Sequence, residues 1–200
     1  GNHEVMNVAG DFRYVTADGF RDYEGKEAAV HRELSQRAPA DQRGRAAAFL
    51  PGEAVAKRLA KRPSILQLGE NVFVHGGLLE QHVRYGIDRI NREIQGWMAA
   101  PRLERAPEIA MTPNGPLWTR IYSDGAPAGS ACDELGRVLR ALSARRLIVG
   151  HTVQERGINS ACDGRVWRID VGLSRFYGKP ASVLEIKGDS VRPINGPARP

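Results

Sequence analysis

Hydrophobic residues follow two different patterns along the 200-residue chain, and the pattern changes at Pro63. Before Pro63, single apolar residues recur every three or four positions within polar sequence, which is typical of exposed helices. Two helices are predicted there, over residues 20–37 with an interruption near Gly25 and over residues 42–61 with a break at Pro51-Gly52. This part of the chain is therefore expected to be helical, with a structural role.

After Pro63 the apolar residues gather in short runs bounded by glycine, asparagine or proline, which predicts β-strands. The runs cover residues 64–68, 72–75, 145–151, 157–161, 166–172, 181–186 and 190–194. Helical periodicity returns between them, over residues 78–98 and 130–144, and a proline-rich loop is predicted over 101–113. Strands that alternate with helices in this way predict an α/β fold.

The composition fits one folded domain with a hydrophobic core. Hydrophobic residues make up 42% of the chain, and 29 basic against 23 acidic side chains give a net charge of +6. The basic residues are scattered, never in a block longer than a pair such as Arg145-Arg146, and no aromatic residues are interleaved with them. We therefore expect a basic surface that attracts phosphorylated ligands, and we do not expect a nucleic-acid partner.

Cysteine spacing and hydropathy argue against several classes of protein. Cys132 and Cys162 lie far apart and form no C-x-x-C pair, so neither a zinc knuckle nor a redox motif is indicated. Two free or buried thiols are expected, and a single disulfide is the open alternative. Because no apolar run approaches the roughly 18 residues of a membrane helix, no membrane span is predicted. The sequence does not fix a compartment.

Three segments place histidine or asparagine beside glycine. They are Gly1-Asn2-His3-Glu4, His75-Gly76-Gly77 and Gly150-His151-Thr152. We expect each of them at the end of a strand, and the carboxyl edge of an α/β sheet is where such folds place ligand-binding groups. Imidazole nitrogen together with amide and carboxylate oxygen suits Mn, Fe, Zn or Co and argues against a thiolate site. The sequence thus predicts a metal-dependent site.

Five short motifs together resemble a known family. They are Gly1-Asn2-His3-Glu4, Arg13-Tyr14-Val15, His75-Gly76-Gly77, Trp118-Thr119-Arg120 and Gly150-His151-Thr152. With them the chain resembles the calcineurin-like metallophosphoesterases of the phosphoprotein phosphatase type, and within that group the Shewanella-like protein phosphatases. The resemblance implies an αββα sandwich of two mixed sheets flanked by helices. Residues 1–200 would be the C-terminal part of a single metallophosphoesterase domain, with a helical insertion at about 16–62.

The resemblance also implies a chemistry. Asn2, His75 and His151 would bind one of two divalent metal ions, with Mn, Fe or Zn expected. A metal-bridging hydroxide would attack the phosphoryl group without a covalent phospho-enzyme. His3 would be the general acid that protonates the leaving alkoxide, a role that suits an imidazole because it titrates near neutrality.

Three further residues receive supporting roles. Arg120 is predicted to bind the substrate phosphate through its planar fork of donors, and a surface salt bridge between two packed aromatics is the alternative. Glu4 and Asp170 are expected to orient neighbouring groups and to take no part as acids. The predicted substrate is a phosphorylated protein or a small phosphomonoester.

Two motifs of this family, G-D-x-H-G and G-D-x-x-D-R-G, do not occur in the chain. Gly10-Asp11 and Gly188-Asp189 lack the histidine or arginine that should follow them. We therefore expect an N-terminally truncated sequence, inactive as an isolated fragment. Two alternatives to a protein phosphatase stay open. One is a diadenosine-polyphosphate or other nucleotide phosphohydrolase of the same superfamily, and the other is a non-catalytic pseudo-phosphatase whose segment 20–61 docks a partner.

Overall fold

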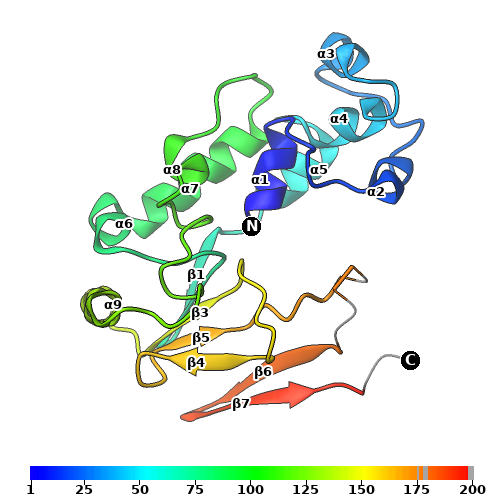
Figure 1. Cartoon of the computed structure of the whole chain (residues 1–200). Coiled ribbons are helices and arrows are strands. Elements are labelled where there is room, and N and C mark those ends of the chain that lie inside the picture. Colours follow the sequence, from blue (N-terminus) through cyan, green and yellow to red (C-terminus); the bar gives the residue numbers. More distant parts are fainter. Residues whose placement is uncertain (175, 178–179, 198–200) are drawn as a thin grey trace. The chain divides into compact units, whose positions relative to one another are not determined.

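The computed structural model describes residues 1–174, 176–177 and 180–197, which form two compact units (Figure 1). Residues 1–64 and 87–112 make up a helical unit, and residues 65–86 with the chain from 113 onward make up a sheet unit. Helices together with a mixed sheet confirm the predicted α/β class. Within the described residues, no helix has the length and apolar character needed to cross a membrane.

The helical unit consists of several short helices and one longer helix. Its helices are α1 (Asn2–Val8), α2 (Ala17–Arg21), α3 (Arg32–Arg37), α4 (Arg43–Phe49), α5 (Ala54–Leu59), α7 (Ile87–Ala99) and α8 (Glu108–Met111). Four residues of α7 spaced by three or four positions are buried, namely Ile90, Ile94, Trp97 and Met98. This burial confirms that the periodicity after residue 87 marks a core-facing helix.

The predicted helix over 20–37 is much shorter than expected. Only α2 and α3 form, and the segment between them is a turn followed by irregular chain. Thr16 is the N-cap of α2, because its Oγ1 accepts a hydrogen bond from Gly19 N at 3.2 Å. The predicted break at Pro51-Gly52 is confirmed, with α4 on one side and α5 on the other.

One buried carboxylate organises the irregular segment before α3. Glu53 is 2% exposed, and its two oxygens accept hydrogen bonds from the backbone N–H groups of Ala29, Val30 and His31 at 2.8–3.0 Å. His31 Nε2 also lies 2.9 Å from the Pro51 carbonyl oxygen. The loop therefore takes its backbone partners from a side chain, as an N-terminal cap does for a helix.

The sheet unit contains a five-stranded mixed sheet and a separate hairpin. Its elements are β1 (Ile65–Leu68), β2 (Asn71–Val74), α6 (Glu80–Tyr85), α9 (Gly129–Ala141), β3 (Arg146–Val149), β4 (Asn159–Ala161), β5 (Val166–Arg168), β6 (Ser182–Lys187) and β7 (Ser190–Asn195). The strand order is β1-β2-β3-β5-β4, and β6 pairs with β7 alone. Strands β2, β3 and β5 are parallel, while β1 and β4 run antiparallel at the two edges.

The continuous helix predicted over 78–98 is wrong. The structure has two helices there, α6 and α7, separated by Gly86. Gly86 has φ +103°, a conformation that only glycine adopts without strain, so the helix cannot run through it. The apolar periodicity continues across the break, which is why the sequence pattern conceals it.

The expectation of two free thiols is also wrong. Cys132 in α9 and Cys162 in the turn between β4 and β5 form a disulfide, with their Cα atoms 5.3 Å apart. The open alternative from the sequence is therefore the one observed. The bond ties the helix to the edge of the sheet.

Candidate functional site

Two of the predicted metal ligands meet at the ends of neighbouring parallel strands. Val74 of β2 and Val149 of β3 are in register, and the ladder extends one step further because Gly150 N donates to the His75 carbonyl oxygen at 2.9 Å. His75 follows β2 directly and His151 follows β3 after Gly150, and His151 Nδ1 lies 3.1 Å from His75 Nε2. The strand-end prediction is confirmed for both histidines.

The two neighbouring imidazole nitrogens are of the donor type that Mn, Fe and Zn accept. In the structure these two nitrogens form a hydrogen bond of 3.1 Å, so one ring donates its proton to the other. A metal ion held by both rings would take the place of that proton. Among the residues that the structure describes, no group of three or more His, Cys, Asp or Glu side chains forms a metal cluster. Two of the three predicted ligands therefore belong to the sheet unit, and the third, Asn2, belongs to the helical unit.

The two glycines after His75 allow another loop of the same chain to approach. A side chain at Gly76 would place its Cβ 2.9 Å from both the Thr119 carbonyl oxygen and Trp118 N. Gly76 N and Gly77 N both donate to the Pro116 carbonyl oxygen, at 2.8 and 3.1 Å. The two glycines thus leave room for the backbone of the loop that carries Arg120.

Arg120 contacts the segment that carries His151. Its Nη1 donates to the His151 carbonyl oxygen at 2.7 Å and to Thr152 Oγ1 at 2.8 Å. The ring of Trp118 also packs edge-on near the His151 ring, with centroids 6.1 Å apart. Sequence spacing gave no signal for these contacts, since they join loops about thirty residues apart.

Asp170, predicted to orient neighbours, shapes the turn after β5. Its Oδ1 accepts a hydrogen bond from Gly172 N at 2.9 Å, and its carbonyl oxygen accepts one from Gln154 N at 2.7 Å. These contacts hold Asp170 beside the chain that leaves His151. Its predicted orienting role stays a prediction.

The opening motif forms the first turn of a helix, where a strand end was expected. Asn2 is the first residue of α1 and is 4% exposed, whereas His3 and Glu4 are exposed. The His3 ring stacks on Tyr14, with ring centroids 5.0 Å apart and planes 19° from parallel. The sequence included Tyr14 in a family motif but did not predict this contact.

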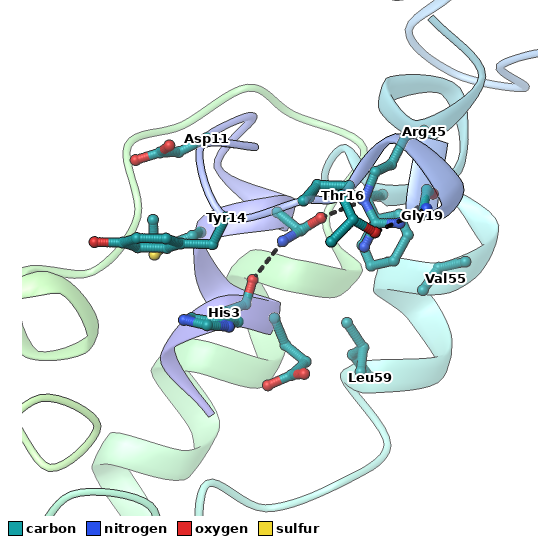
Figure 2. A pocket seen from close by; sticks show the side chains of 13 residues that line it. His3, Asp11, Tyr14, Thr16, Gly19, Arg45, Val55 and Leu59 are labelled. Atoms are coloured by element: carbon teal, nitrogen blue, oxygen red, sulfur yellow. Dashed lines mark hydrogen bonds between the residues drawn. The ribbon is translucent and has the colours of Figure 1, made fainter. Parts of the chain in front are cut away.

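A pocket of about 440 Å³ lies beside His3 within the helical unit (Figure 2). His3 and Tyr14 lie on one side of it, and the apolar side chains of Val55 and Leu59 lie across from them. The remaining lining residues are Glu4, Met6, Asn7, Asp11, Val15, Thr16, Gly19, Arg45 and Phe49. The pocket therefore combines an aromatic wall, an apolar wall and a polar end.

Asn7 and Arg45 build the polar end of this pocket. Asn7 Nδ2 donates to the His3 carbonyl oxygen at 2.7 Å, and Asn7 Oδ1 accepts from Arg45 Nε at 2.5 Å (Figure 2). The Arg45 guanidinium lies over the rings of Tyr23 and Phe49, and burial lowers the pKa of Arg45 below its ordinary value. Neither Asn7 nor Arg45 was singled out from the sequence.

No protein-family model matches the chain. It is 37% identical to Shewanella-like protein phosphatase 2 of Arabidopsis thaliana over 224 aligned residues, covering 95% of this chain and 56% of that protein. It is 29% identical to Shewanella-like protein phosphatase 1 of Plasmodium berghei, covering 97% of this chain and 52% of that protein. The chain thus spans about half the length of these curated relatives.

Solved structures share the fold. A cold-active protein tyrosine phosphatase structure at 1.1 Å resolution aligns with a TM-score of 0.62 at 22% identity, over 86% of this chain and 47% of that one. A mutant of a cold-active protein tyrosine phosphatase aligns with a TM-score of 0.66 at 20% identity, over 98% of this chain and 56% of that one. Together with the sequence matches, these likenesses confirm the family resemblance that the motifs indicated. The chain is a relative of the Shewanella-like protein phosphatases.

Proposed function

We propose that this chain is part of a metal-dependent phosphomonoester hydrolase that acts on phosphorylated proteins. The observation that carries the proposal is the His75–His151 pair, with nitrogens 3.1 Å apart at the ends of β2 and β3. The relation to Shewanella-like protein phosphatases supports it, and their name supports a protein substrate. We further propose that the whole fold is the αββα sandwich of one domain.

The proposal assigns metal binding and proton donation to different residues of the chain. His75 Nε2 and His151 Nδ1 would hold a metal ion, with the Asn2 amide oxygen as a third ligand and Mn, Fe or Zn as the expected metals. A pair of bound metal ions would supply Lewis acidity that neutralises the phosphoryl oxygens and activates water. His3 would donate its proton to the leaving oxygen, and its place on the wall of the pocket gives it access to a ligand there.

The remaining residues bind and orient. Arg120 is exposed and would donate to a phosphoryl oxygen, which favours arginine over lysine because the guanidinium is a planar fork of donors. Glu4 and Asp170 would orient their neighbours.

The proposal is tested on the whole protein with Mn²⁺, using p-nitrophenyl phosphate and a set of phosphopeptides. Replacing His75 by Asn should abolish metal-dependent turnover, and His3→Asn should lower kcat by about 10²–10⁴-fold while metal binding is retained. His31→Gln is the matched control, because its ring contacts the Pro51 carbonyl oxygen and has no part in the proposed chemistry.

Three results would contradict this function. Hydrolysis confined to dinucleoside polyphosphates would assign the protein to the nucleotide phosphohydrolases of the superfamily. Full activity in His3→Asn would show that His3 is not the general acid. Absence of turnover with every metal and substrate, together with binding of a partner through residues 20–61, would make it a pseudo-phosphatase.

A further inference from the structure

The loop over residues 118–123 holds the loop over residues 151–154 through several hydrogen bonds. Arg120 Nη1 bonds both the His151 carbonyl oxygen and Thr152 Oγ1. Ser123 Oγ lies 2.7 Å from the same Thr152 oxygen. Gln154 Nε2 completes the set by donating to the Ser123 carbonyl oxygen at 3.0 Å and to the Thr152 carbonyl oxygen at 2.8 Å.

His151 needs such support because its backbone is in the left-handed region, with φ +64°. Residues with a Cβ populate this region sparsely, and they persist there when surrounding contacts fix them. Arg120 bonds the carbonyl group of His151 itself and the side chain of the next residue. The contacts therefore act on the peptide unit that follows His151 and on the side chain of Thr152 next to it.

Burial makes this network more than a surface contact. Arg120 is exposed, but Ser123 is 1% exposed and Gln154 is 8% exposed, so one side of the network is closed to water. Hydrogen bonds that are closed to water hold their geometry better than those that compete with solvent. Thr152 lies between the exposed arginine and the buried pair and links them.

We propose that Arg120 is a positioning residue for His151: through Nη1 it fixes the residue 151–152 backbone so that His151 Nδ1 faces His75 Nε2. This inference rests on the proposed function, because it assigns Arg120 a role at the same metal site. It adds to the predicted contact with phosphate. Thr152 shares the positioning role as the hydroxyl through which Arg120 acts.

The test measures metal affinity in the whole protein by Mn²⁺ titration calorimetry, with the visible absorption of the Co²⁺ form as a second readout. Loss of partners that orient a metal-bound histidine weakens metal binding by about 10–100-fold. We expect Arg120→Met and Thr152→Val each to weaken Mn²⁺ binding by about tenfold and to alter the Co²⁺ spectrum. Thr152→Ser keeps the hydroxyl and should restore the affinity.

Controls separate this inference from the function on which it rests. Arg137→Lys alters an arginine of the same unit that pairs with Glu80, and it should leave Mn²⁺ affinity unchanged. Thermal melting of each variant shows whether it folds. His75→Asn identifies the binding event that belongs to this site.

Two outcomes would overturn the inference, and they differ. If His75→Asn weakens Mn²⁺ binding but Arg120→Met and Thr152→Val bind it within twofold of the parent, Arg120 does not position His151. A raised KM or a weaker inhibition by inorganic phosphate in Arg120→Met would then assign it to phosphate alone. If His75→Asn binds Mn²⁺ as the parent does, the proposed metal site itself falls, and this inference with it.

Discussion

The imidazole ring of His3 lies flat against the phenol ring of Tyr14, with centroids 5.0 Å apart and planes 19° from parallel. Both residues line the pocket in the helical unit. A stacked partner restricts the rotamers of an exposed imidazole, and such pairs are worth about 0.5–1.5 kcal/mol beyond the area they bury. Tyr14 therefore limits the directions in which His3 can present a proton.

If His3 is the general acid, Tyr14→Leu should lower kcat, because the unstacked imidazole spends less time aligned with the leaving oxygen. We expect about a tenfold loss with a phosphoserine peptide, whose alkoxide leaves poorly without a proton, and a smaller loss with p-nitrophenyl phosphate. Tyr14→Phe retains the stack and is the matched control. Equal losses with both substrates would show that Tyr14 does not act through proton donation.

Two helical glycines should respond in opposite ways to alanine. A Cβ at Gly44 in α4 would lie 1.9 Å from the Tyr23 carbonyl oxygen, whereas a Cβ at Gly96 in α7 would have no heavy atom within 4 Å. Gly44→Ala should therefore destabilise the protein by about 1–3 kcal/mol. Gly96→Ala should stabilise it by up to about 1 kcal/mol, because alanine has the better helix propensity. Urea unfolding measures both, and a stable Gly44→Ala variant would contradict the close packing of α4 on residue 23.

The disulfide should contribute measurably to stability. Cys132 and Cys162 are separated by 30 residues, and closing a loop of this length stabilises a fold by about 3–4 kcal/mol in the chain-entropy account. The Cys132→Ser and Cys162→Ser variants, and the parent with reductant, should all lose this amount in denaturant unfolding. Mass spectrometry after thiol alkylation provides the direct check, since labelling of both cysteines in the native parent would show that the bond is absent.

Acid should weaken the fold through His82. This side chain is fully buried in α6, its Nδ1 accepts from Leu79 N at 3.1 Å, and burial lowers the pKa of His82 below its ordinary value. The unfolded chain therefore binds a proton more readily than the folded one does. Its contribution to stability is full above the unfolded pKa of about 6.5 and is lost as the pH falls from there through the folded pKa. The free energy of unfolding of the parent should fall between pH 8 and pH 5, and this fall should be smaller in His82→Gln. The same pH dependence in parent and variant would contradict the assignment.

The contact between His75 and His151 could be predicted from the sequence, because it depends only on where the strands end and on which strands are parallel neighbours. Each histidine follows a short apolar run, and neighbouring parallel strands bring their carboxyl ends to one edge. The α/β class follows from the same runs. These features need only the order of the elements.

Other features depend on contacts that no local pattern encodes. The break at Gly86 lies inside an unbroken apolar periodicity, so only the backbone angle reveals it. Arg120 contacts His151 because Gly76 leaves room for the loop that carries Arg120. Tyr14 stacks on His3 because the chain turns back after α1. Whether Cys132 and Cys162 pair depends on where α9 packs, which cysteine spacing leaves open.

Glu53 has a consequence for how the helical unit tolerates change. The carboxylate bonds the backbone of residues 29–31 and not their side chains, so it recognises the course of the loop and not its sequence. Substitutions of the exposed side chains of Ala29 and Val30 should therefore leave the path of the loop unchanged. A substitution of Glu53, by contrast, should destabilise the loop strongly, because it would leave three backbone N–H donors without their acceptor at once.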